Sequence, residues 1–101
     1  MVGVPQYAGR QKLYSALLIL ACQPGPIDER LAAAHRLAIG TIDPHLDIPP
    51  EFKAEFQRIR DELHKEFVFH TRGPGNSRKQ WAGDMATQIV ALYDKMARNR
   101  R

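Results

Sequence analysis

The loop in front of the last predicted helix combines glycine, proline and basic residues. Residues 68–83 contain Arg72, Arg78 and Lys79 but no acidic residue. Cations in a first helical turn oppose the helix dipole, whereas a bound anion is favoured there by the dipole and by free backbone amides. The sequence therefore predicts an anion site, for a phosphate-type group, made by Arg72, Ser77, Arg78 and Lys79. The alternative is a solvated loop in which Ser77 only caps the helix, and the GxxxxGK[ST] spacing of a nucleotide-binding loop is absent.

The histidines and acidic residues do not have the spacing of a metal site. No two histidines are four residues apart, no HExxH motif occurs, and the single cysteine has no partner. Asp43, His45 and Asp47 place three possible ligands in one connector, but aspartate is also common in turns. We therefore expect no metal and no cofactor, a partly buried His35 and a solvent-facing His64.

Catalytic motifs are also missing. There is no GxSxG sequence and no cysteine–histidine signature. Glu62 and Glu66 are like charges four residues apart, but they alternate with basic residues on what we expect to be the solvated face of a helix. We therefore predict no catalytic residue, and an enzyme would need a pocket of convergent polar groups that only a structure can show.

Cys22 has two interpretations. The apolar run before it, with a small residue directly in front of the cysteine, resembles the cleavage box of bacterial lipoproteins, in which the cysteine is lipidated. Tyr14 and Ser15 interrupt that run, however, and Leu20 suits the box less well than a small residue. We expect Cys22 to be a buried, inert thiol at a helix end. N-terminal lipidation stays open as a second alternative.

Four amphipathic segments must position these residues. Apolar side chains recur at i, i+3 and i+4 in each of them, and proline or glycine separates one from the next. The predicted helices cover approximately residues 10–23, 26–42, 50–67 and 77–98. The fold expected is a single all-α domain over residues 1–101, either a small four-helix bundle or an orthogonal helical array.

The apolar stripes also predict which side chains form the core. We expect six of them to be mostly buried and packed together: Leu17, Leu31, Phe56, Ile59, Trp81 and Leu92. Three further apolar residues, Leu18, Leu20 and Phe69, exceed what one four-helix core needs. This surplus predicts a surface for protein–protein contact.

Composition supports a soluble, cytoplasmic domain without specifying its function. The chain has 101 residues, a net charge of +4, 44% hydrophobic and 26% charged residues. Its longest apolar run is far below the roughly 20 residues that cross a bilayer, so no transmembrane segment is expected. The favoured interpretation is a non-enzymatic interaction or accessory module, as a homodimer or with a protein partner. The alternative is a nucleic-acid-associated or anion-binding regulator that uses the basic loop.

Overall fold

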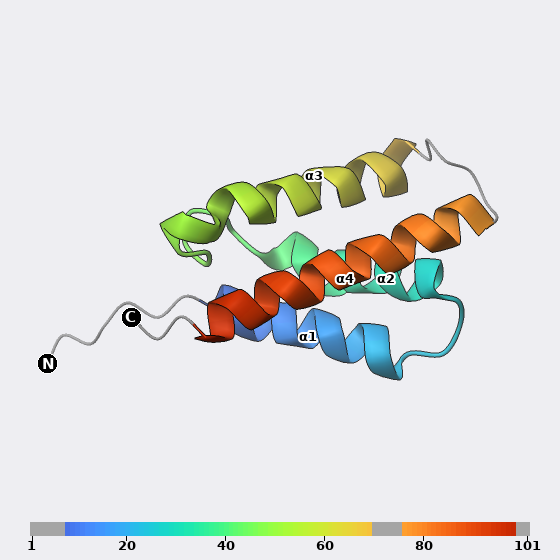
Figure 1. The fold of residues 1–101 in the computed structure, drawn as a ribbon, viewed down its shortest axis with the longest axis horizontal. Helices are drawn as coiled ribbons and strands as arrows, with labels where there is room; N and C mark the ends of the chain where they lie inside the picture. The colour runs from blue at the N-terminus through green and yellow to red at the C-terminus, as the bar shows by residue number, and fades with distance from the viewer. Residues whose placement is uncertain (1–7, 70–75, 99–101) are drawn as a thin grey trace, which may run out of the picture.

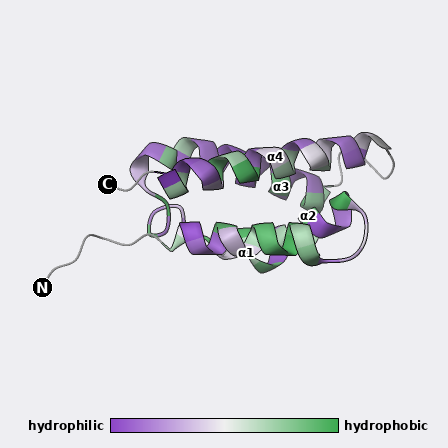
Figure 2. Cartoon of the chain, turned by 60° about the horizontal axis from the view of Figure 1, so that its bottom comes forward, coloured by the Kyte–Doolittle hydropathy of each residue, from purple (hydrophilic) through white to green (hydrophobic). Residues whose placement is uncertain are grey.

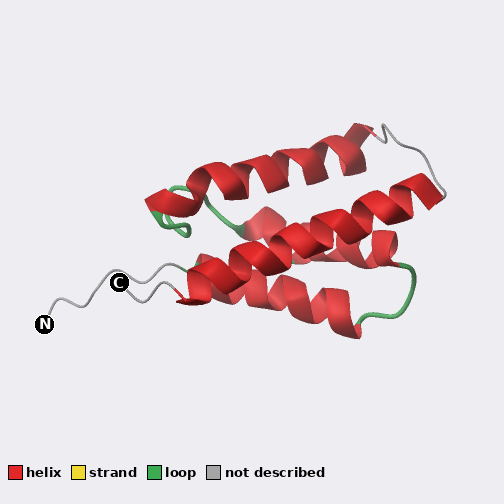
Figure 3. Cartoon of the chain, viewed as in Figure 1, coloured by secondary structure: helices red, strands yellow, loops and turns green. Residues whose placement is uncertain are grey.

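The computed structural model describes residues 8–69 and 76–98, and the regular elements in these ranges are all helical (Figures 1 and 3). Four α-helices pack against each other, and successive helices run in opposite directions (Figure 1). This arrangement confirms the predicted all-α class. The α-helices are α1 (Gly9–Cys22), α2 (Ile27–Leu37), α3 (Lys53–Phe69) and α4 (Asn76–Arg98), with short 3₁₀ turns at Ile39–Thr41 and Pro50–Phe52.

The second helix is shorter than the predicted 26–42. It ends at Leu37, because Ala38 leaves helical geometry with φ −128° and ψ −62° and a 3₁₀ turn follows. The hydroxyl of Thr41 donates a 2.6 Å hydrogen bond to the carbonyl of Ala38, which stabilises the tighter turn. Gly40 lies within that turn, and glycine weakens a helix interior. The other three helix boundaries agree with the prediction to within three residues.

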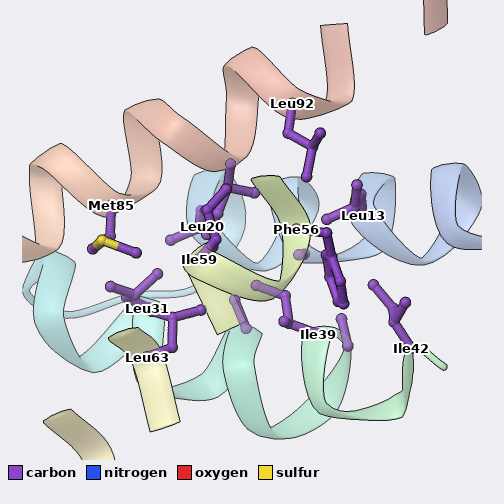
Figure 4. Close-up of a cluster of buried hydrophobic side chains, with 14 of the residues drawn as sticks. Leu13, Leu20, Leu31, Ile39, Ile42, Phe56, Ile59, Leu63, Met85 and Leu92 are labelled. Carbon is purple, nitrogen blue, oxygen red and sulfur yellow. The ribbon is translucent and has the colours of Figure 1, made fainter. Parts of the chain in front are cut away.

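The four helices surround one cluster of buried apolar side chains, and the labelled ones converge from every helix (Figure 4). Five of the six predicted core residues are buried: Leu31, Phe56, Ile59, Trp81 and Leu92. Leu17 is only half-buried, which corrects the prediction for that residue. Leu20 was expected to be surplus but is 7% exposed, because the buried stripe of α1 runs through Leu13, Ala16 and Leu20.

Glu66 corrects the expectation that the acidic residues of α3 are solvated. It is 1% exposed. Its position explains the burial, since it lies three residues after the buried Leu63 and therefore on the same side of the helix. The opposite end of α3 is joined to α4 by an ion pair of 3.1 Å between Lys95 and Glu55.

The connector between α2 and α3 is integrated into the core and is not a solvated link. Ile48 is fully buried in it. The carbonyl of Asp47 accepts a 2.9 Å hydrogen bond from the amide of Gly9, and its carboxylate accepts one of 2.8 Å from Lys12 Nζ. The bonds from Lys12 and from the Asp43 amide lower the pKa of Asp47 below its usual value. The connector therefore fixes the beginning of α1.

The far end of α1 is held by α2. Nη1 of Arg30 donates a 2.7 Å hydrogen bond to the carbonyl of Leu20, in the last turn of α1, where a cation also suits the helix dipole. Among the described residues, no helix combines the length and the apolar composition that a membrane crossing requires.

Candidate functional site

The predicted anion site is only partly within the described residues. Arg72 lies outside them. Helix α4 begins at Asn76, one residue before the predicted start, so Ser77 lies in its first turn instead of at the N-cap position. Ser77 and Lys79 are exposed, whereas Arg78 is half-buried. The described residues therefore do not bring the basic side chains together, and anion binding stays a prediction.

Arg78 is in contact with neighbouring helices. Its guanidinium lies over the ring of Phe67 in α3, 5.3 Å from the ring centroid, and its Nε is 3.9 Å from Oδ2 of Asp28 in α2. Asp28 and Arg78 occupy the first turns of α2 and α4, so these two helices begin side by side. The carboxylate of Asp28 thus offsets the positive charge of Arg78, which opposes the α4 dipole, and no external anion is needed for this.

His35 lies in surroundings that are unfavourable to a positive charge. Its ring lies 5.7 Å from the ring of Phe67, and it is half-buried between α2 and α3, as the sequence predicted. Burial lowers the pKa of His35, and the nearby positive groups of His64 and Arg60 lower it further. His64 itself is exposed, which confirms that prediction.

The lowered pKa of His35 predicts an acid-sensitive fold. The unfolded chain binds a proton at this position near pH 6.5, and the folded chain binds it only at lower pH, so folding loses stability as the pH falls below 6.5. We expect the melting temperature to drop between pH 7.5 and pH 5, and His35→Gln to reduce that drop. His45→Gln, at an exposed histidine, is the control and should keep the wild-type slope. Equal slopes in both variants would contradict the role of His35.

Asp43, His45 and Asp47 form a hydrogen-bonded turn. Oδ1 of Asp43 accepts a 2.8 Å bond from the amide of His45, and the amide of Asp47 donates to the carbonyl of Asp43 at 2.7 Å. The side chain of His45 is exposed to solvent. Over residues 8–69 and 76–98, no three histidine, cysteine, aspartate or glutamate side chains are grouped as metal ligands.

Cys22 is exposed, which corrects the prediction of a buried thiol. It is the last residue of α1 and lies on the side opposite the buried stripe, because it follows Leu18 by one helical turn. Cleavage in front of Cys22, as lipidation would require, would remove the buried side chains of Leu13, Ala16 and Leu20 from the core.

The outer side of α1 carries no formal charge over most of its length. From Leu13 to Cys22 the helix contains no acidic or basic residue, on either side. Tyr14 is 50% exposed and Leu18 is 45% exposed, one turn apart on the outer side. In Figure 2 the ribbon of α1 is purple at its beginning and mostly green, the colour of hydrophobic residues, over the rest of its length. Most exposed helix surfaces are instead covered by charged and polar residues.

Helix α4 continues this apolar surface. The rings of Tyr14 and Tyr93 lie 5.9 Å apart, which places the two outer edges in contact. A line of uncharged residues with helical spacing follows on α4: Gly83, Ala86, Val90, Tyr93 and Ala97. Val90 is 50% exposed, and because α1 and α4 are antiparallel, it lies beside the turn that carries Leu18.

A groove of about 400 Å³ lies at one end of this surface. It is lined by Arg10, Gln11, Tyr14, Ser15, Tyr93 and Ala97. We call the whole surface, from this groove through Leu18 and Val90 to Cys22 and Gly83, the α1–α4 face. Leu18 and Val90, each about half-exposed, lie a single helical turn beyond Tyr14 and the groove.

The sequence predicted only one residue of this face, Leu18, as surplus to the core. Leu20 is buried, and Phe69, which is 69% exposed, lies at the end of α3 away from the face. Two signals in the sequence indicate the remaining residues of the α1–α4 face. One is the absence of charge from Leu13 to Cys22, and the other is a second apolar line on α4 beside its core stripe. Neither shows that the two lines adjoin, which the contact between Tyr14 and Tyr93 establishes.

Comparison of the chain with protein-family models, with curated protein sequences and with solved structures gave no significant match.

Proposed function

We propose that this protein is an interaction module that binds an uncharged, apolar helical surface through its α1–α4 face. The observation that carries the proposal is the exposure of Tyr14, Leu18 and Val90 on two adjoining helices, of which α1 has no charged residue from Leu13 to Cys22. Contiguous apolar patches of this kind mark interaction sites in proteins, whereas single exposed apolar residues do not. The partner's chemistry follows from the face, since a charged group placed against it would lose hydration without gaining an ion pair.

The apolar residues exposed elsewhere support this choice of surface. Leu46, at 73% exposed, stands alone in the connector, and Leu37 stands alone at the end of α2. Val68 and Phe69 are also exposed, at 49% and 69%, but both belong to the last turn of the single helix α3. The other outer helix, α3, carries alternating acidic and basic residues on its solvent side. The α1–α4 face therefore differs from these sites because its exposed apolar residues come from two adjoining helices.

Binding of a designed helix tests this function. The probe is a fluorescent helical peptide of zero net charge, with leucine, alanine and tyrosine along one side and glutamine and serine along the other. We expect saturable binding by fluorescence anisotropy, lost in Leu18→Arg. Leu46→Arg is the matched control, because it introduces the same charge at an exposed leucine outside the face. Equal binding by both variants, or no binding by the wild type, would contradict the proposal.

A further inference from the structure

We infer that the partner of the α1–α4 face is the same face of a second copy of this chain, packed about a two-fold axis. The inference rests on the docking function proposed above and specifies which molecule docks on the face. In a two-fold contact, a residue away from the axis meets a different residue of the other copy, and the second copy repeats that contact in reverse. A side chain exposed away from the axis therefore needs room on the other copy at the position that the axis assigns to it.

The α1–α4 face places a groove and exposed apolar side chains at different positions along α1. The groove lies beside Tyr14 and Tyr93, and the half-exposed side chains of Leu18 and Val90 lie one helical turn further along. Along α1, the groove residues Arg10 to Ser15 lie towards the beginning and Leu18 towards the end. A two-fold axis near the middle of α1 thus places Leu18 of each copy at the groove of the other. The same operation covers the whole length of the helix.

The charge distribution favours a second copy over an acidic partner. Each chain has a net charge of +4, so two copies repel each other unless they meet through an uncharged surface. The α1–α4 face is that surface. Arg10 lines the outer end of the groove, and Lys79 lies one turn beyond Gly83 at the other end; both are exposed, so solvent screens their charges. A nucleic acid or an acidic protein would gain little on this face, because its middle has no cation.

The size of the face fits a reversible dimer. Helix α1 has 14 residues. It is therefore about 21 Å long, and two adjoining helices are together about 20 Å wide, which gives a projected area of about 400 Å². The accessible area of a surface covered by side chains exceeds its projection, and a specific interface needs about 500 Å² from each partner. The face thus has the size of a small, reversible interface and is smaller than obligate interfaces are.

Sedimentation equilibrium over low micromolar to near-millimolar concentrations tests the inference. We expect the wild-type chain to shift from monomer to dimer and not to larger species, since a two-fold contact closes on itself. Leu18→Arg and Val90→Arg should each weaken the dimer at least about 100-fold, because each buries an unpaired guanidinium in the contact. Leu46→Arg should dimerise as the wild type does. Melting curves by circular dichroism confirm that each variant is folded.

Salt dependence gives a second readout. Raising the salt concentration should strengthen the dimer or leave it unchanged, because screening reduces the repulsion between two chains of net charge +4. A wild-type chain that stays monomeric, or Leu18→Arg dimerising like the wild type, would overturn the inference. So would a dimer that weakens with salt. If the chain is monomeric but still binds the designed helix, the self-association fails and the docking function stands.

Discussion

Replacing Phe56 by alanine is expected to lower the free energy of unfolding by about 3–5 kcal/mol, because the cavity left in a close-packed core is only partly refilled. Phe56 is fully buried, in the third helix, and Arg60 covers its ring with the guanidinium 5.9 Å from the centroid. A domain of this size has a total stability of about 5–15 kcal/mol, so the loss is a large share of it. The melting temperature should fall by more than about 12 °C.

Phe69→Ala is the matched control for this prediction. Phe69 lies on the same helix but is 69% exposed, so the same deletion removes little buried surface. Thermal unfolding followed by circular dichroism compares the two variants with the wild type. A Phe56→Ala variant that melts within two or three degrees of the wild type would show that α3 does not pack as described.

Gly9→Ala is expected to destabilise the fold although alanine is the better helix former. A Cβ at position 9 would lie 2.5 Å from the carbonyl oxygen of Asp47 and 2.6 Å from Cδ1 of Ile48. The backbone oxygen cannot move away without breaking the 2.9 Å hydrogen bond that it accepts from the Gly9 amide. The clash costs about 1–3 kcal/mol and loss of the bond adds about 0.5–1.5 kcal/mol.

The opposite result is expected at Gly83, which provides the control. A Cβ there meets no atom within 4 Å, so Gly83→Ala should stabilise α4 by up to about 1 kcal/mol through helix propensity alone. Urea unfolding of the two variants and the wild type measures both effects. If Gly9→Ala is as stable as the wild type, the connector does not press against α1 as the structure shows.

Local sequence patterns are sufficient to predict the helices, because spacing and proline breaks act within a few residues. On α4, the predicted core residues Trp81 and Leu92 are both buried, and they belong to a buried stripe that runs to Met96. The error at the end of α2 had a local signal, Gly40, whose helix-weakening effect the apolar spacing up to Ile42 obscured. The burial of Glu66 also had a local signal in the sequence, because the spacing of Glu66 from Leu63 places it on the buried side of α3.

The contacts between distant segments could not be predicted in this way. Nothing near Asp47 indicates that its carbonyl accepts a hydrogen bond from Gly9 or that its carboxylate meets Lys12. The candidate site has the same limitation. Its composition is visible in the sequence as a lack of charge on two helices, but its existence depends on α1 and α4 lying side by side, with Tyr14 against Tyr93.

A concentration series of amide NMR spectra tests most directly whether the α1–α4 face is an interaction surface. On going from low to high concentration, we expect shifts that converge on Tyr14, Leu18, Val90 and Tyr93, with Leu46 and the solvent side of α3 unchanged. Shifts that are independent of concentration, or that map to Leu46 or to α3 while the α1–α4 face stays unchanged, would contradict the account.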